Sequence, residues 1–218
     1  MTDLSKTENR TLMRQARESL RGSWILAVLT FLVYVLVLAI PQMIPKAGGL
    51  ISLLITGPMW LGLCIFSLAI SRKQGPQCEQ IFFGFKRFGV SLGAYLLQTI
   101  FIILWAILLL IPGIIAALSY SMTFFIIAEN DSIGPLEVIR ESKKIMYGNK
   151  WKFFCLNLRF IGWGWLCILT LGIGFLWLSP YMLVSFAKFY DDLIKKDESG
   201  DEKDFEFISD LDETMGQV

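Results

Sequence analysis

Long apolar blocks alternate with short charged segments along this chain of 218 residues. The longest block, from Phe88 to Ala128, contains no charged residue and is about twice the ~20 residues that one membrane-spanning helix needs. The pattern predicts an all-α, polytopic membrane protein with six transmembrane helices, each long enough to cross a hydrocarbon core of ~30 Å. The predicted spans are residues 23–40, 49–71, 90–111, 112–128, 151–171 and 172–190.

Pro112 and Gly113 lie in the longest block, where they could kink one helix, break it at a binding site or turn the chain. A single kinked helix would approach ~40 residues. It would also place the basic segments 72–87 and 140–152 on opposite sides of the membrane. A proline disfavours the α conformation at the residue before it and suits the first turn of a helix. We therefore predict an external hairpin turn between the third and fourth spans.

The basic residues are distributed asymmetrically about these spans. Apart from Lys46 and Arg159, every Lys and Arg lies in or beside the segments 1–22, 72–89, 129–150 and the C-terminal tail. Because cytoplasmic loops carry an excess of Lys and Arg, these segments are predicted to be cytoplasmic, together with both chain termini. The predicted location is the cytoplasmic (inner) membrane, in a multi-pass arrangement.

A five-span alternative joins Phe160–Phe186 into one tilted helix. It would export Lys188, Lys195 and Lys196 together with the acidic tail. The sequence Thr170-Leu171-Gly172-Ile173-Gly174 instead favours a tight external turn, because glycine adopts positive φ at little cost.

Three regions follow from this threading. Residues 1–22 are predicted to form a cytoplasmic amphipathic helix, and residues 23–190 the membrane domain. The first span has no cleavage signal after it and is expected to remain as an anchor. Residues 191–218 form an acidic cytoplasmic tail that is predicted to be disordered.

The N-terminal segment carries a basic stripe, because four arginines recur at spacings of 4, 3 and 4 residues. An apolar face lies about 120° from this stripe. The helix is predicted to lie on the inner leaflet with its arginines at anionic phosphates, or else to pack on the protein's own loops. The stripe is Arg10, Arg14, Arg17 and Arg21, and the apolar face is Leu12, Met13, Ala16 and Leu20.

A second short cytoplasmic helix is predicted between the fourth and fifth spans, at Pro135–Tyr147, with proline in its first turn and Gly148 just past its end. The end of this helix and the start of the next span have the same sequence pattern as the N-terminal segment: Arg-Glu-Ser, then a glycine, then a tryptophan. An ancient duplication and repeated use of one way to start a span both explain this. The basic residues expected at lipid headgroups here are Lys143, Lys144, Lys150 and Lys152.

The composition of the chain limits the kinds of partner and chemical site that we expect. The chain is 55% hydrophobic and 18% charged, has no histidine, and carries a net charge of +1, which indicates no nucleic-acid partner. Its four cysteines form no Cys-x-x-Cys pair, and no hydrolase or nucleotide-binding motif occurs. We expect no catalytic residue, no cofactor and no metal site.

Arg159 is the one ionisable side chain well inside a predicted span, and such residues are candidates for function. It could contact a ligand or lipid headgroup, with Asn157 beside it, or simply extend to the inner surface. Pro58 and Pro180 break predicted spans as Pro112 does, which is typical of transporter sites but also of ordinary kinks. The paired carboxylates Glu129 and Asp131, and likewise Asp191 and Asp192, are interpreted as solvated span ends.

An ordered series of short motifs resembles the bacterial membrane-protein family known as domain of unknown function 975. The resemblance covers roughly residues 10–193, although Arg159 stands where a small or polar residue is expected and the acidic tail lies beyond the shared part. It implies a six-helix bacterial membrane protein without an established activity. The chain is also distantly similar to the membrane domain of some glycerophosphodiester phosphodiesterases. The motifs are Ala16–Trp24, Ile111–Ile114, Tyr120–Met122, Glu141–Ser142, Gly148–Lys152, Phe160–Trp163, Leu169–Gly174, Pro180–Tyr181 and Phe189–Tyr190.

Besides a role as the membrane partner of a catalytic subunit, two functions remain open at this point. The first is a non-enzymatic accessory or envelope-associated role, with the bilayer, anionic inner-leaflet lipids, and a partner membrane protein or second copy of the chain as candidate partners. The second is a small transporter or lipid-handling channel with a cavity near Arg159.

Overall fold

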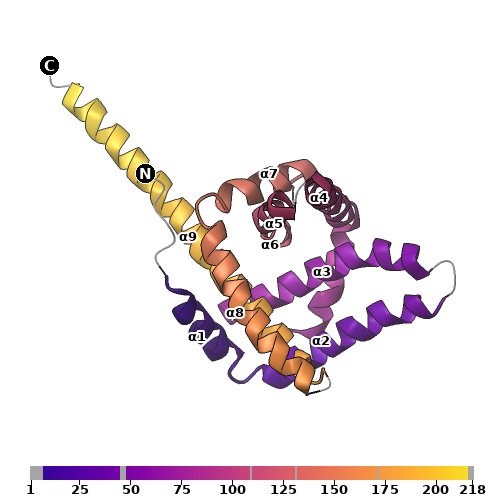
Figure 1. Ribbon diagram of the computed structural model, residues 1–218. Coiled ribbons are helices and arrows are strands. Elements are labelled where there is room, and N and C mark those ends of the chain that lie inside the picture. Colours follow the sequence, from indigo (N-terminus) through magenta and orange to yellow (C-terminus); the bar gives the residue numbers. More distant parts are fainter. Residues whose placement is uncertain (1–6, 45–47, 109, 131, 171, 216–218) are drawn as a thin grey trace.

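The computed structural model describes residues 7–44, 48–108, 110–130, 132–170 and 172–215, with side chains up to Lys195 except those of residues 108 and 110. Every regular element in these ranges is a helix, so the all-α prediction is confirmed there (Figure 1). The elements are α1 (Asn9–Leu20), α2 (Trp24–Ala39), η1 (Ile40–Met43), α3 (Gly48–Arg72), η2 (Cys78–Arg87), α4 (Phe88–Leu108), α5 (Leu110–Ser119), α6 (Thr123–Glu129), α7 (Pro135–Ile145), α8 (Lys150–Leu169) and α9 (Phe175–Met215).

Five stretches in the described ranges are long and apolar enough to cross a membrane, and each overlaps one of the first five predicted spans, although the third begins at Cys78 instead of residue 90. The sixth predicted span, residues 172–190, is the beginning of α9 and is not among them. The charged residues Lys188 and Asp191 shorten its apolar part. The five stretches are Trp24–Met43, Gly48–Arg72, Cys78–Ile107, Ile111–Glu129 and Lys150–Leu169.

The hairpin predicted at Pro112 is present, but the chain turns earlier, between α4 and α5. Gly113 lies against Ala106, where an added Cβ would be 2.9 Å from the Ala106 Cα. Farther along the pair, the rings of Phe101 and Tyr120 are 6.2 Å apart, so the two helices are antiparallel. Pro112 lies in the first turn of α5, where its missing N–H removes no helical hydrogen bond. The helix can therefore begin two residues before it.

A second antiparallel pair shows that the merged helix Phe160–Phe186 is wrong. The helix is interrupted between α8 and α9, where Gly172 has φ +84°. A turn that uses glycine at positive φ was predicted here. Ring contacts then join the pair along its length: Phe160 to Tyr181 at 5.5 Å and Phe153 to Phe189 at 5.1 Å.

Two segments differ from the prediction. The fourth span is not continuous, because residues 120–122 form a turn between α5 and α6. The predicted cytoplasmic loop 72–89 contains η2, which packs along α3 rather than standing free in water. The two backbones approach closely because each has a glycine at the contact: Gly62 faces the Ile81 carbonyl, and Gly84 faces the Pro58 carbonyl.

The short helices α1 and α7 are attached to the bundle in the same way. Ser19 in α1 donates a hydrogen bond to the Ser71 carbonyl at 3.4 Å, and Ser142 in α7 donates one to the Ser119 carbonyl at 2.9 Å. Each helix is followed by a glycine with positive φ, +93° at Gly22 and +80° for its counterpart after α7. The sequence pattern that the two segments share thus corresponds to a shared structural role. In each short helix a buried serine donates a hydrogen bond to a carbonyl near the end of another helix.

The apolar face of α1 contacts protein, as in the second placement considered for it, but it packs on the helices α3, α8 and α9 and not on loops. Leu12, Ala16 and Leu20 are at most 1% exposed, and Tyr181 of α9 donates a hydrogen bond to the Met13 carbonyl at 3.1 Å. The four arginines of the stripe are exposed on the opposite face. Their contact with anionic lipid stays a prediction.

The tail also differs from the prediction, because α9 continues as a helix to Met215 and extends well beyond the other helices (Figure 1). Its Glu and Lys residues have good helix propensity, no proline follows Pro180, and a helix already formed is extended at little cost. Residues 216–218 lie outside the described part.

Candidate functional site

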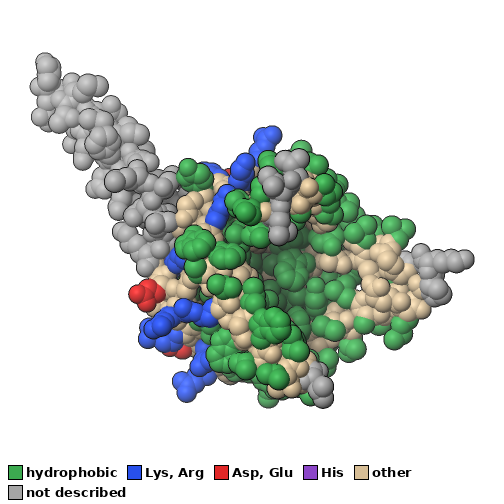
Figure 2. Space-filling model, in the orientation of Figure 1, with side chains coloured by type: hydrophobic (Ala, Val, Ile, Leu, Met, Phe, Trp, Pro, Cys, Tyr) green, Lys and Arg blue, Asp and Glu red, His purple; other side chains and the backbone are tan. Residues whose placement is uncertain are grey.

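A cavity of about 650 Å³ lies among α2, α3, α4, α5, α6, α8 and α9. It opens through one face of the molecule, where Figure 2 shows a hollow with hydrophobic side chains in its floor. The turn between α5 and α6 contributes to it, since the fourth span changes direction there and directs two phenylalanines into the wall. The lining residues are Tyr34, Thr56, Trp60, Tyr95, Gln98, Thr99, Ile102, Ile114, Ala117, Leu118, Ser121, Phe124, Phe125, Phe153, Asn157, Leu183 and Phe186.

The polar groups of the cavity wall mostly bind their own helices. Thr56, Thr99 and Asn157 each donate a hydrogen bond to the carbonyl four residues earlier, at 2.6, 2.7 and 2.9 Å. Gln98 differs, because its buried Oε1 has no hydrogen-bond partner among the described residues. A buried acceptor without a partner costs free energy, so this amide favours a ligand that offers a hydroxyl or N–H donor.

The cavity wall carries no Asp, Glu, Lys or Arg among the residues that the structure describes. Such a wall has no strong acid, base or counter-charge, so it favours neither proton transfer nor binding of a bare ion. Its size is within the ~300–1,000 Å³ range of small-molecule sites. Its aromatic and aliphatic surface fits a hydrocarbon chain or another uncharged apolar molecule.

The structure separates the two residues that the sequence analysis paired. Asn157 lines the cavity, but Arg159 is exposed and extends toward α1, where its Nη1 is 3.8 Å from the Met13 sulfur. Two residues along a helix correspond to a rotation of about 200°, so the two side chains leave α8 on nearly opposite sides. The cavity is therefore not the one predicted near Arg159.

The predicted helix breaks lie around the cavity rather than in its wall. Pro58 and Pro180 are inside α3 and α9, and Pro112 is in α5. None of them is among the lining residues. The Pro58 carbonyl faces Gly84 of η2, where the absence of a side chain permits a close helix contact.

A charged network joins helix ends that the sequence analysis treated as solvated. Arg72 at the end of α3 forms salt bridges with Glu129 of α6 and with Asp191 of α9, the latter at 2.7 Å. Tyr190 donates a hydrogen bond to Glu129 at 2.7 Å, and Ser71 donates one to Asp191 at 2.6 Å. The carboxylates therefore connect three helices. Asp131 lies outside the described residues.

The same end of the molecule holds α1 and the start of α8. Lys152 Nζ is 3.4 Å from Asp192, and the Asn9 amide donates a hydrogen bond to the Lys152 carbonyl at 3.0 Å. Lys152 was predicted to lie at lipid headgroups. Its side chain is only 17% exposed and is directed into the protein instead. Lys143 and Lys144 are exposed, as predicted for headgroup contacts, and Lys150 is half-buried.

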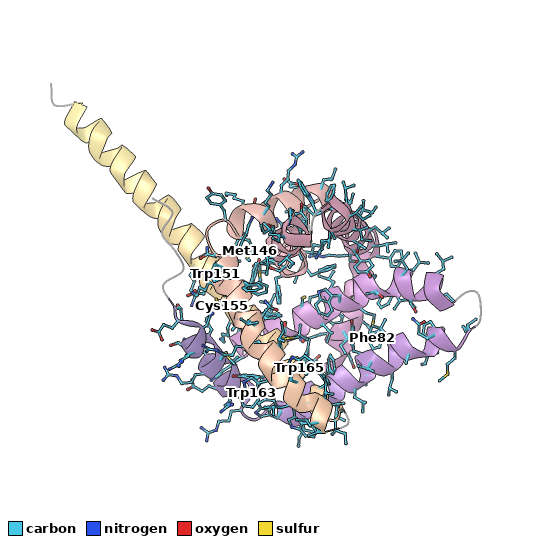
Figure 3. The ribbon with its side chains drawn as sticks, viewed as in Figure 1. Phe82, Met146, Trp151, Cys155, Trp163 and Trp165 are labelled. Carbon is cyan, nitrogen blue, oxygen red and sulfur yellow. The ribbon has the colours of Figure 1, made fainter. Side chains whose placement is uncertain are left out.

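Tryptophans are exposed on the outer surface of α8 at both of its ends. Trp151 at its start is 74% exposed, and Trp163 and Trp165 lie near its other end (Figure 3). At ~1.5 Å per residue, roughly 20 Å separate these two levels. Tryptophan is enriched at both membrane–water interfaces, so the placement agrees with a helix that crosses a bilayer.

Comparison with protein families supports part of the resemblance noted in the sequence. Residues 106–197 match the family described as protein of unknown function (DUF975). The match covers α5 to α8 and the first part of α9, and hence both Glu129 and Asn157. No curated protein and no solved structure matches the chain. Similarity to the membrane domain of glycerophosphodiester phosphodiesterases stays a prediction.

Proposed function

We propose that the chain is an accessory, non-enzymatic protein of the bacterial cytoplasmic membrane that binds a lipid-like molecule within its helices. Residues 106–197 match the DUF975 family, whose function is unknown. The observation that supports this proposal is the cavity beside Gln98 and Asn157. An apolar wall without charged residues suits a hydrocarbon chain, and the unpaired Gln98 oxygen suits a donor on its polar end. Lipids are the abundant molecules of that description around a membrane protein.

The outer surface supports the same proposal. Ile107, Leu166 and Leu169 are more than half exposed on α4 and α8, as expected for side chains that face lipid rather than water. A second apolar hollow of about 320 Å³ lies between α8 and α9 and shares Asn157 with the cavity.

We further propose six membrane spans with both termini in the cytoplasm. The ends of α3, α6 and α9 that meet at Arg72 are all ends that the charge pattern assigns to the cytoplasm, which supports this threading. Only five spans are evident from length and apolarity, so the sixth, the start of α9, is part of the proposal.

Single-cysteine labelling tests the proposed sidedness. With the four native cysteines replaced by alanine, a cysteine at Met43 should react with an impermeant maleimide added to intact cells. A cysteine at Tyr147 should react only after the membrane is opened. Both positions are well exposed, at 83% and 67%, so reactivity reports sidedness and not burial. The reverse pattern would invert the threading.

Photo-crosslinking tests the cavity. The purified full chain is reconstituted with phosphatidylglycerol that carries a diazirine in one acyl chain, illuminated, and mapped by mass spectrometry. Crosslinks should concentrate in the peptides around Gln98 and Asn157. Ala117→Phe places a ring in the cavity and should reduce crosslinking there about tenfold, a loss of ~1.4 kcal/mol in binding.

Leu104→Phe is the matched control, because Leu104 is 60% exposed on the outside of α4 and does not line the cavity. It adds the same ring and should leave the cavity crosslinks unchanged. Uniform labelling of the outer faces, with both variants alike, would reject the cavity as a lipid site.

A further inference from the structure

A second large hollow, of about 700 Å³, lies at the end of the bundle where α3, α6 and α9 meet α1. Among the residues whose side chains the structure describes, its wall carries four cations and two carboxylates. We call the four cations, Arg72, Lys73, Lys188 and Lys195, the lysine cup; the carboxylates are Glu129 and Asp191. None of these cations belongs to the residues predicted to contact the inner leaflet.

Both carboxylates already have a partner. Arg72 forms salt bridges with both Glu129 and Asp191, so these three groups together keep one net negative charge, against the three positive charges of the lysines. Lys188 donates a hydrogen bond to the Ser71 carbonyl, which carries no net charge. Lys73 and Lys195 form no salt bridge with any residue whose side chain is described. The cup therefore has a surplus of positive charge directed into one hollow.

Lys188 is half-buried at the centre of this surplus. The same hollow is lined by Arg72, Lys73 and Lys195, and among the residues with described side chains its carboxylates are Glu129 and Asp191. Cations held near one another in a partly desolvated hollow repel, and an anion placed among them removes that repulsion.

The backbone at Lys73 is a second, independent observation. Lys73 follows the last residue of α3 and has φ +56°, a conformation that side-chain-bearing residues rarely adopt. Its neighbour Gln74 donates a hydrogen bond to the Ala69 carbonyl at 2.9 Å, which closes the helix end in the manner that usually selects glycine. The chain places a lysine at this position although a glycine follows two residues later. The strain is explained if the ammonium group is needed in the hollow.

We propose that the lysine cup binds a phosphate-bearing anion through the ammonium groups of Lys73, Lys188 and Lys195. Ammonium groups form charge-assisted hydrogen bonds with phosphate oxygens, and Arg72 stays paired with its carboxylates and positions the wall. The phosphate can come from the headgroup of an anionic phospholipid at the membrane edge or from a soluble phosphate.

Thermal unfolding of the purified full chain in neutral detergent tests the site and separates the two sources. One arm adds inorganic phosphate at constant ionic strength set with chloride, and the other adds phosphatidylglycerol, with phosphatidylcholine as reference. A bound anion should raise the Tm by mass action. Lys73→Gln and Lys188→Gln should each weaken the apparent affinity about tenfold. Lys86→Gln removes an exposed cation that does not line this hollow and should change the affinity less than about twofold.

Lys73→Gly distinguishes binding from a structural role. It should raise the Tm of the unliganded protein, because glycine relieves the backbone strain, and should weaken the apparent affinity for the anion about tenfold, as Lys73→Gln does. Protection by phosphatidylglycerol alone assigns a lipid headgroup, protection by phosphate alone assigns a soluble ligand, and protection by both assigns the phosphate group itself. The proposal is rejected if neither anion protects beyond its reference, or if Lys73→Gln behaves like Lys86→Gln.

Discussion

Replacement of Gly84 by alanine is expected to lower the free energy of unfolding by about 3 kcal/mol or more. A Cβ at this position would lie 1.9 Å from the Pro58 carbonyl oxygen and 2.8 Å from its carbon. These are backbone atoms inside α3, so no side-chain rotation can make room. The only relief is for η2 to move away from α3, which would also open the neighbouring contact between Gly62 and the Ile81 carbonyl.

Gly89→Ala is the matched control, because an added Cβ at Gly89 meets nothing within 4 Å. In the first turn of α4, alanine should be neutral or stabilising by up to ~1 kcal/mol. Unfolding of both variants can be followed by circular dichroism as a denaturing detergent is titrated into a mild one. Equal stability of the two variants would show that the α3–η2 contact is not rigid in solution.

The effect should extend to the cavity. α4 continues from η2 and crosses α3 at another close contact, where a Cβ on Gly57 would be 2.9 Å from the Ser91 carbonyl oxygen. Tyr95, Gln98 and Thr99 on α4 form one wall of the cavity. A displaced η2 would therefore displace the polar groups that we propose to contact a lipid.

The spans were predictable because lipid imposes a simple physical rule: backbone polar groups must be satisfied within each segment, and side chains must be apolar. Residues 49–71 and 151–171 accordingly match α3 and α8 to within two residues. The sequence analysis was less successful where protein, and not lipid, surrounds the chain. η2 was interpreted as a loop because its residues are mixed in character, although Cys78, Ile81 and Gly84 recur every third residue, the spacing of a 3₁₀ helix.

The candidate site was harder to predict. A charged residue inside an apolar span directs attention to Arg159, yet helix rotation places Asn157 in the cavity and Arg159 outside it. Arg72 and its two carboxylates lie on three helices far apart in sequence, and no local pattern joins them. One signal was present: Glu129 and Asp191 end predicted spans on the same side as Arg72, and charges at such positions tend to pair.

Replacement of Arg72 by methionine is expected to cost about 2–3 kcal/mol of unfolding free energy. The change leaves Glu129 and Asp191, with side chains 29% and 14% exposed, close to each other without their shared cation. Tyr190 and Ser71 would still donate hydrogen bonds to them, but neither supplies charge. Partial exposure keeps the cost below the ~3–5 kcal/mol of a fully buried broken pair.

Arg14→Met provides the comparison, because it also removes an arginine that faces a carboxylate. The Arg14–Glu18 pair is 4.0 Å apart with side chains 72% and 63% exposed, so its loss should change stability by no more than about 0.5 kcal/mol. The decisive variant combines Arg72→Met with Glu129→Gln and Asp191→Asn. If unpaired charge is the cause, this triple variant should recover more than half of the lost stability in the same denaturation measurement, although it carries two further substitutions. A triple variant less stable than Arg72→Met alone would instead show that the hydrogen bonds of the carboxylates, and not their charge, hold α3, α6 and α9 together.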